Sequence, residues 1–149
     1  MPENIKEIEK GLKVIIYARY STQSKFLNEQ IQKIMDYCKK KDLEVVSVQR
    51  EVGKGRRFFR IALWKAMRSK KADAVVIYNM SRISRELNTA QKLISKIYKH
   101  NKILISVEDD SIINPELLSR ICEVNKIGSM INLELLDSLA ENMCEADIL

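Results

Sequence analysis

The sequence predicts an α/β protein with a mainly parallel four-stranded sheet flanked by helices, followed by a C-terminal amphipathic helical tail. Two observations support this prediction. Short apolar segments alternate with segments of about 10 to 17 residues that have helical periodicity, which is typical of right-handed crossovers between parallel strands. In addition, 149 residues with 46% hydrophobic side chains suffice for one domain with a substantial core.

The first half of the body is expected to contain two strands and a helix. Residues Lys13 to Ala18 are almost entirely apolar and predict the first strand. A helix is expected from about Phe26 to Lys41, because its apolar residues recur at helical spacing and three lysines suit the C-terminal end of the helix dipole. Leu43 to Val48 predicts the second strand.

The second half begins with the segment EVGKGRRFFR, whose two glycines and four cations predict a flexible basic loop. A short helix is expected from about Ile61 to Ser69, and Ala72 to Tyr78 predicts a nearly continuous apolar strand. The segment NMSRISRELN leads into a helix that reaches about His100, and Ile103 to Val107 predicts the fourth strand. Residues 1–110 therefore form the expected body of the protein.

Residues 111–149 are expected to form the helical tail. Pro115 suits the first turn of a helix, and apolar residues recur at helical spacing on both sides of Gly128. The tail can lie on its own sheet or pair with another subunit, and its length beyond the body favours an oligomerisation element.

The charge of the chain is unevenly distributed. The net charge is +6, but residues 129–149 contain five acidic residues and no Lys or Arg, so residues 1–128 carry +11. A body this basic points to a polyanionic partner, most commonly nucleic acid, although charge alone does not separate this from ordinary solubility.

Composition argues against several other classes of protein. No apolar run approaches the roughly 20 residues of a membrane span, and the polar segment MPENIKEIEK does not resemble a secretory signal, so we expect a cytoplasmic protein without membrane contact. Cys38, Cys122 and Cys144 are odd in number and scattered, which predicts reduced thiols packed on helices rather than a metal site.

Polar residues that suit phosphate chemistry follow two of the expected strands. Arg19 and Ser21 come where the first strand ends, in VIIYARYST, and Ser81, Arg82 and Arg85 follow the third strand. Ligands of a parallel sheet bind beyond the carboxyl ends of its strands, so the two groups can converge. Arg82 and Arg85 are expected to share one face of the following helix. A hydroxyl near three guanidiniums suits a phosphate, whereas the alternative is surface cations with Ser21 capping a helix.

Other site chemistries have weaker support. The only histidine, His100, is expected at a helix end, and no nucleophile elbow surrounds Ser21, which argues against a hydrolase triad. No G-x-G-x-x-G follows a strand, and GKGRR lacks P-loop spacing, which argues against a nucleotide site. Strand alternation places Tyr20 on the face opposite Ser21, so Tyr20 is a poor candidate for the nucleophile.

Four motifs in order resemble the catalytic domain of the serine recombinases, the resolvases and invertases. They are IYARYST, LNEQI, FRIAL and SRISR, and the resemblance runs from about Lys13 to Asp110. It implies that Ser21 attacks a DNA phosphodiester, forming a 5′-phosphoserine and releasing a 3′-hydroxyl, and that Arg19, Arg82 and Arg85 bind the scissile phosphate. It also implies that Gln30 and Arg60 support the site, that no metal or other cofactor is needed, and that a homodimer assembles into a tetramer at synapsis.

The chain departs from the family pattern at three places. Ser81 stands where the family commonly has an aspartate, the shortened loop VGKGRR places Lys54 or nothing where the family has a serine, and an acidic segment replaces the usual basic helix and DNA-binding domain. The main expectation remains a site-specific DNA recombinase with DNA as substrate. It is either the catalytic part of a longer protein or a compact protein that relies on a separate DNA-binding partner for site recognition. The alternative is an accessory or regulatory protein that oligomerises with a full-length recombinase and has little or no activity itself.

Overall fold

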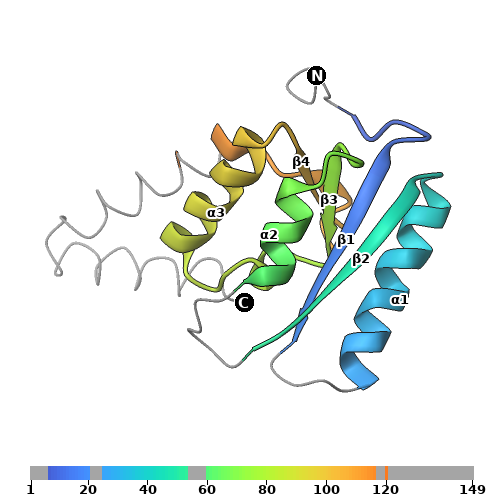
Figure 1. Ribbon diagram of the computed structural model, residues 1–149, viewed down its shortest axis with the longest axis horizontal. Coiled ribbons are helices and arrows are strands. Elements are labelled where there is room, and N and C mark those ends of the chain that lie inside the picture. Colours follow the sequence, from blue (N-terminus) through green and yellow to red (C-terminus); the bar gives the residue numbers. More distant parts are fainter. Residues whose placement is uncertain (1–6, 21–24, 54–59, 117–119, 121–149) are drawn as a thin grey trace, which may run out of the picture. The chain divides into compact units, whose positions relative to one another are not determined.

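The computed structural model describes residues 7–20, 25–53, 60–116 and 120. A five-stranded sheet forms the centre of the fold, with strand order β2-β1-β3-β4-β5 (Figure 1). The strands are β1 (Lys13–Tyr20), β2 (Glu44–Val52), β3 (Ala74–Ile77), β4 (Ile103–Ser106) and β5 (Ser111–Ile112). The predicted α/β class with a mainly parallel sheet is confirmed, and the sheet has one strand more than expected.

The four longer strands are parallel, and only β5 is antiparallel to its neighbour β4. The predicted end of the second strand at Val48 was wrong, because β2 continues to Val52 and pairs Arg19 with Glu51 and Tyr20 with Val52. Its last four residues, QREV, do not form an apolar run, so hydropathy gave no reason to extend the strand. This extension brings the ends of β1 and β2 to the same edge of the sheet.

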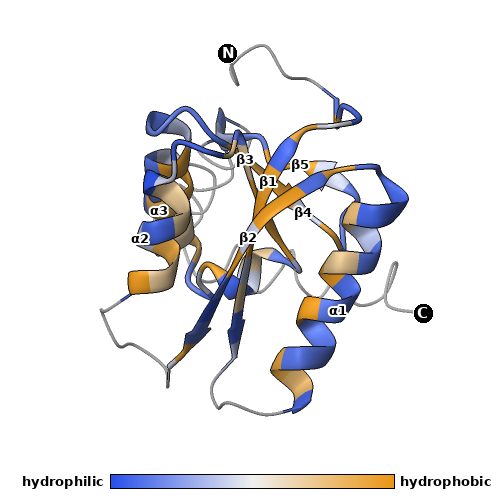
Figure 2. Cartoon of the chain, turned by 45° about the vertical axis from the view of Figure 1, so that its right-hand side comes forward, coloured by the Kyte–Doolittle hydropathy of each residue, from blue (hydrophilic) through white to orange (hydrophobic). Residues whose placement is uncertain are grey.

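Helices cover both faces of the sheet, as expected from right-handed crossovers. Helix α1 (Lys25–Lys40) lies on one face, and α2 (Ile61–Arg68) and α3 (Leu87–Lys99) lie on the other (Figures 1 and 2). A short 3-10 helix, η2 (Met80–Arg82), follows β3. The packing contacts agree with this arrangement, since α1 packs on β1, α2 on β1 and β2, and α3 on β4.

The core has two layers because successive side chains of β1 point to opposite faces. Val14, Ile16 and Ala18 are fully buried beneath α1, together with Leu27 and Ile34 of that helix. The layer under α2 and α3 is formed by the other β1 side chains and by fully buried residues of the neighbouring elements: Ile15, Tyr17, Leu63, Met67, Val75, Ile77, Ile83, Ile94, Ile97 and Leu104. Each aliphatic side chain of this kind contributes roughly 1.5–3 kcal/mol through burial. Both layers are therefore well filled around β1, the strand that leads to the site.

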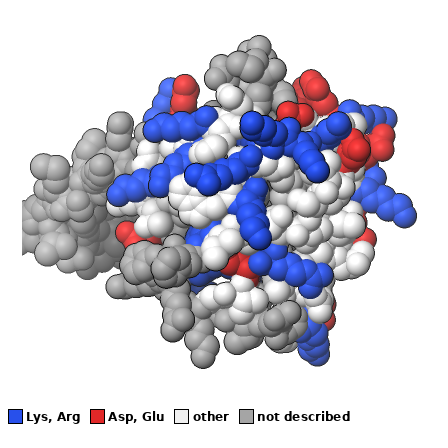
Figure 3. Space-filling view, viewed as in Figure 1, with Lys and Arg blue, Asp and Glu red and all other residues white. Residues whose placement is uncertain are grey.

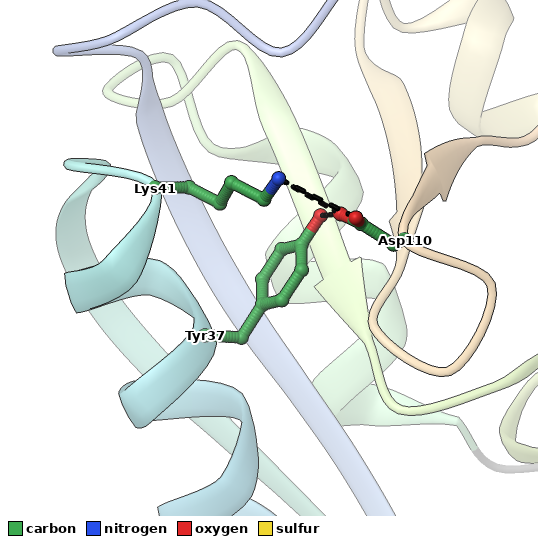
Figure 4. Close-up of polar contacts among 3 residues, drawn as sticks. All are labelled: Tyr37, Lys41 and Asp110. Carbon is green, nitrogen blue, oxygen red and sulfur yellow. Dashed lines mark hydrogen bonds and ion pairs between the residues drawn. The ribbon is translucent and has the colours of Figure 1, made fainter.

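The turn between β4 and β5 is attached to the end of α1 (Figure 4). Tyr37 donates a hydrogen bond to Asp110 Oδ1 at 2.7 Å, and Lys41 Nζ lies 3.1 Å from the same oxygen. Asp110 has a φ of +47°, a conformation that Asp tolerates better than most residues. These contacts connect two segments that are far apart in sequence, and they lie immediately before β5.

By internal contacts the chain divides into two compact units, residues 1–115 and 116–149. Pro115 and Glu116 are helical, in agreement with a proline in the first turn of a helix. The predicted start of the helical tail at residue 111 was wrong, because Ser111 and Ile112 form β5 and pair with β4. Most of the remaining tail, including Cys122 and Cys144, lies outside the described residues. None of the helices in the described part of the chain is long and apolar enough to cross a membrane.

Candidate active site

The candidate site begins at Arg19, next to the end of β1. Its main chain is held by the buried side-chain amide of Gln30 on α1. Arg19 N donates to Gln30 Oε1, and Gln30 Nε2 donates to Arg19 O, both at 3.3 Å. The half-buried Arg19 side chain extends toward β2, where its Nη2 lies 3.9 Å from the position that a Cβ on Gly53 would occupy. The end of β1 therefore has a defined position relative to both α1 and β2.

Arg82 reaches the same point from β3. It is the last residue of η2, and its Nη1 donates to the carbonyl of Arg19 at 3.3 Å. Its guanidinium also lies over the Tyr20 ring, 5.6 Å from the ring centre, at a distance that allows a cation–π interaction. The structure thus brings Arg19, Gln30 and Arg82 together, three residues that the sequence analysis assigned to the site.

A buried carboxylate lies beside these arginines. Glu51 pairs with Arg19 across the strands, is 7% exposed, and accepts a short hydrogen bond from the Tyr17 hydroxyl. Burial raises the pKa of Tyr17 well above its usual value, and the bond to Glu51 raises this pKa further. Tyr17 therefore stays protonated and acts as a hydrogen-bond donor.

Arg60 supplies a third guanidinium at the first turn of α2. It is half-buried at the N-cap position, and burial lowers its pKa. Its charge interacts unfavourably with Arg19 and favourably with Glu51, which places all three groups in one electrostatic cluster. Arg60 Nη1 and Arg82 Nε are buried and have no hydrogen-bond acceptor among the described residues. Buried donors of this kind suit an anion that supplies the missing acceptors.

The expected helical pairing of Arg82 and Arg85 was wrong. Arg82 ends η2, whereas α3 begins only at Leu87, so the two arginines do not lie on one helix. The Ser84 hydroxyl accepts a hydrogen bond from the Glu86 N–H, and such local turns compete with helix formation. Arg85 is exposed and makes no hydrogen bond or ion pair with another described residue.

Ser81 is also exposed, and its hydroxyl donates to Asn79 Oδ1 at 2.6 Å. It does not contact Arg82 in place of the aspartate that is common in the family pattern. Ser21 and Lys54 lie outside the described residues, so their places in the site remain predictions. Ser21 directly follows Tyr20, and Lys54 directly follows Gly53.

The described residues give the site a positive character. Arg19 and Arg60 share an electrostatic cluster with one carboxylate, that of Glu51, and Arg82 adds a third guanidinium at the carbonyl of Arg19. The four charges sum to +2 at neutral pH. Within these residues no group of three or more His, Cys, Asp or Glu side chains is placed to hold a metal ion. The arrangement suits electrostatic stabilisation of a phosphoryl group by guanidinium donors.

Two residues of this cluster, Tyr17 and Glu51, were not among the predicted site residues. Tyr17 lies within the expected first strand, and Glu51 lies within the expected basic loop. A signal was present for Glu51, because it is the single acidic residue in EVGKGRRFFR and belongs to a segment with four cations. A carboxylate in such a segment suggests pairing with arginines rather than solvent exposure.

A family model described as "Resolvase, N terminal domain" matches residues 14–131 of the chain. This match covers the whole of the cluster described above as well as Ser21 and Arg85. No curated protein matches the sequence at a significant level.

Several solved structures share the fold. The N-terminal catalytic domain of TP901-1 integrase is 24% identical with a TM-score of 0.65, and the match covers 76% of this chain and 96% of that one. A resolvase family site-specific recombinase from Streptococcus pneumoniae is 19% identical with a TM-score of 0.63, and the match covers 88% of this chain and 97% of that one. The C-terminal catalytic domain of ISC1926 TnpA, an IS607-like serine recombinase, is 21% identical with a TM-score of 0.59, and the match covers 80% of this chain and 83% of that one. At these identities the likeness establishes a common fold.

Proposed function

Because the chain belongs to the resolvase N-terminal domain family, we propose that it cleaves and rejoins DNA through a covalent bond between Ser21 and a DNA phosphate. The observation that carries the proposal is that Arg82 and Arg60 both interact with Arg19, near the end of β1. Arg19 is two residues before Ser21 in the sequence. Two of these arginines have buried N–H groups that no described residue accepts. A scissile phosphate would supply those acceptors.

The reaction that fits these groups is phosphoryl transfer to a serine. The Ser21 oxygen attacks phosphorus and loses its proton, the bond from phosphorus to the 3′ oxygen breaks, and that oxygen leaves as a hydroxyl. Attack by a 3′-hydroxyl on the 5′-phosphoserine then restores the DNA backbone and returns a proton to Ser21. No bond energy is lost to water, so rejoining needs no nucleotide cofactor.

The arginines act through charge and geometry. Negative charge increases on the phosphate oxygens in the transition state, and preorganised guanidiniums stabilise that charge. Nearby cations also favour the ionised serine. Gln30 and the Tyr17–Glu51 pair position Arg19 and Arg60 and do not touch the reacting atoms. Arg85 joins Arg19 and Arg82 on the scissile phosphate, while Ser81 and Lys54 contact DNA next to it.

Strand exchange needs more than one subunit, since each Ser21 cleaves one strand. We therefore propose a homodimer that forms a tetramer at synapsis, with residues 116–149 as the oligomerisation element and residues 1–115, which include β5, as the catalytic part. A separate DNA-binding partner would supply recognition of the site, and the reaction would take place in the cytoplasm.

A second candidate function is that of an accessory protein which oligomerises with a full-length recombinase without cleaving DNA. The observation that favours it is Ser81, whose hydroxyl is bonded to Asn79 and which leaves no carboxylate beside Arg82. Loss of that carboxylate removes a group that would orient the arginine.

A covalent-adduct assay tests the proposal. The purified protein is incubated in EDTA with duplex DNA from the genomic flanks of its gene, and denaturing gels are examined for DNA bound to protein. We expect an adduct with the wild type and with Tyr20→Phe, and none with Ser21→Ala that has a wild-type circular dichroism spectrum. An adduct that persists in Ser21→Ala contradicts the assignment, and activity that requires magnesium indicates a metal-dependent nuclease. Absence of any wild-type adduct, together with co-assembly with an active recombinase, supports the accessory function.

A further inference from the structure

Helices α2 and α3 carry five basic residues and no acidic residue. Their sequences are IALWKAMR and LNTAQKLISKIYK. Helix α1, on the opposite face of the sheet, mixes its lysines with Glu29 and Asp36. The outer basic surface of α2 and α3, called here the α2–α3 face, consists of Trp64, Lys65, Arg68, Lys92, Lys96 and Lys99.

Helical spacing places these residues on the side away from the sheet. Helix α2 buries Ala62, Leu63, Ala66 and Met67, which leaves Trp64, Lys65 and Arg68 exposed. Helix α3 buries Ala90, Ile94 and Ile97, which leaves Lys92, Lys96 and Lys99 exposed at intervals of four and three residues. Neighbouring lysines in this row are separated by about 4.5 to 6 Å along the helix axis.

Trp64 joins the two helices into one surface. Its ring has Arg68 of its own helix 5.7 Å from the ring centre and Lys96 of α3 at 5.4 Å. The ring is nevertheless 38% exposed, and Ile61, one turn earlier, is 60% exposed. A large aromatic side chain between two cations is therefore left accessible to solvent.

The cations of this face are not neutralised by the described part of the chain. None of the five forms an ion pair with a described acidic residue, whereas Lys41, directly after α1, does so with Asp110. Figure 3 shows Lys and Arg side chains gathered over the side of the molecule on which α2 and α3 lie. Unneutralised like charges held close together repel one another, and an anionic partner relieves that repulsion.

We propose that the α2–α3 face binds the phosphate backbone of duplex DNA outside the reaction site. The lysine row extends about 10.5 Å along the axis of α3 from Lys92 to Lys99, which is close to three phosphate steps along one DNA strand, about 10.2 Å of the duplex axis. Both helices run from the carboxyl edge of the sheet back toward its amino edge, because each connects parallel strands. The cations therefore follow the surface away from Arg19 and would extend the DNA contact beyond the scissile phosphate.

The choice of DNA as the polyanion rests on the proposed function. Backbone contacts of this kind would be independent of sequence, would hold the duplex in register, and would weaken as salt is added. They would also give the basic body an affinity for DNA that does not depend on a separate DNA-binding domain.

Fluorescence anisotropy with a labelled duplex of about 30 base pairs, over a series of salt concentrations, tests the proposal. The variant Lys92→Gln, Lys96→Gln, Lys99→Gln is compared with Lys33→Gln, Lys39→Gln, Lys40→Gln, which removes the same number of exposed charges from α1. We expect the α3 variant to bind at least roughly tenfold more weakly and its salt slope to fall by about 2 to 3, since each phosphate contact contributes about 0.9. We expect the α1 variant to bind nearly as the wild type does. Equal losses in the two variants, or no loss in either, overturn the proposal.

Trp64 provides a direct second measurement, because it is the only tryptophan in the chain. Duplex binding should change its emission, and an unchanged emission at saturation contradicts contact at this face. Vesicles rich in anionic lipid serve as a competitor, and tighter binding to them than to the duplex would assign the face to a membrane surface instead.

The duplex-binding assay and the covalent-adduct assay test the two proposals separately. Lysine-dependent binding without any Ser21-dependent adduct retains this surface and rejects the recombinase. A Ser21-dependent adduct together with unaltered duplex binding by the α3 variant retains the recombinase and rejects the α2–α3 face as a DNA-binding surface.

Discussion

The side-chain amide of Gln30 makes two hydrogen bonds to the main chain of Arg19, accepting from its N–H and donating to its carbonyl, each at 3.3 Å. Arg82 donates to the same carbonyl from the other side. One backbone unit at the end of β1 therefore connects α1, β1 and η2. Movement of any of these elements would shift the arginines together.

Replacing Gln30 with Leu removes both bonds while keeping a buried side chain of similar size. We expect a loss of about 1–2 kcal/mol in the free energy of unfolding, measured by urea denaturation, because the buried main-chain groups of Arg19 lose a partner. Adduct formation should fall at least roughly tenfold as Arg19 becomes less well positioned. Gln32→Leu is the matched control, since Gln32 is exposed on the same helix and bonds only to Asp36. Equal effects of the two substitutions would contradict a specific role for Gln30.

The substitutions Arg82→Lys and Arg85→Lys each keep the positive charge and remove the planar guanidinium. We expect each to lower the rate of adduct formation on the order of tenfold or more, equivalent to about 1.4 kcal/mol, because an ammonium cannot make two parallel hydrogen bonds to a phosphate. Arg82→Lys should have the larger effect, since Arg82 also bonds to the carbonyl of Arg19. Arg50→Lys, at an exposed arginine of β2 that bonds to Asn28, serves as the control. Unchanged rates of adduct formation in both variants would contradict a catalytic role for these two arginines.

Tyr17→Phe removes the donor to the buried carboxylate of Glu51. We expect a destabilisation of about 1–3 kcal/mol, because Glu51 is only 7% exposed and loses a hydrogen bond. Tyr20→Phe should change stability by less than about 0.5 kcal/mol, since the part-exposed Tyr20 hydroxyl has no hydrogen bond to a described residue. Chemical denaturation of the two variants measures the difference. Equal free energies of unfolding in the two variants would show that the hydrogen bond from Tyr17 to Glu51 makes no net contribution to stability.

The pH dependence of stability tests the contact at Asp110. The hydrogen bond from Tyr37, followed by that from Lys41, holds the pKa of Asp110 below its usual value of 3.8. Because the folded-state pKa is lower than the unfolded-state pKa, the ionised Asp110 stabilises the folded protein fully above the unfolded-state pKa. This contribution is lost as the pH falls through the folded-state pKa. Asp110→Asn retains an acceptor and tolerates the positive φ but cannot titrate. Urea midpoints measured between about pH 5 and pH 2 should therefore fall less steeply in Asp110→Asn, and parallel curves would contradict the assignment.

Hydropathy was sufficient for the parts of the fold that are apolar and long. It located β1, β3, β4 and all three helices, because buried strands and amphipathic helices differ in period. It did not locate β5, whose two residues, Ser111 and Ile112, are too few for any pattern, and it ended β2 before the polar pair Arg50 and Glu51. Hydrogen bonds to β1 and β4, rather than the local sequence, define these segments.

The sequence also predicted part of the geometry around Arg19. Strand ends located Arg19 and Arg82, because the topology of a parallel sheet fixes which edge carries the ligand. Family resemblance supplied Gln30, since nothing in its spacing predicts a bond to Arg19. The start of α3 depends on the turn at Ser84, so the relative placement of Arg82 and Arg85 required the structure.

The remaining prediction concerns residues 129–149 of the tail, which lie outside the described residues. Leu135 and Leu139 are i, i+4 neighbours in an apolar pattern, and five acidic residues with no Lys or Arg accompany them in residues 129–149. A second copy of the chain is the natural partner for such a segment, because it offers both an identical apolar stripe and a basic body. We expect light scattering to show a dimer or larger species at tens of micromolar, and the double variant Leu135→Asp, Leu139→Asp to shift the protein toward monomer with an unchanged circular dichroism spectrum. Lys39→Asp together with Lys40→Asp, on exposed sites of α1, controls for the added negative charge. A monomeric wild type would remove the dimer and weaken the case for synapsis, because a single Ser21 can cleave only one strand at a time.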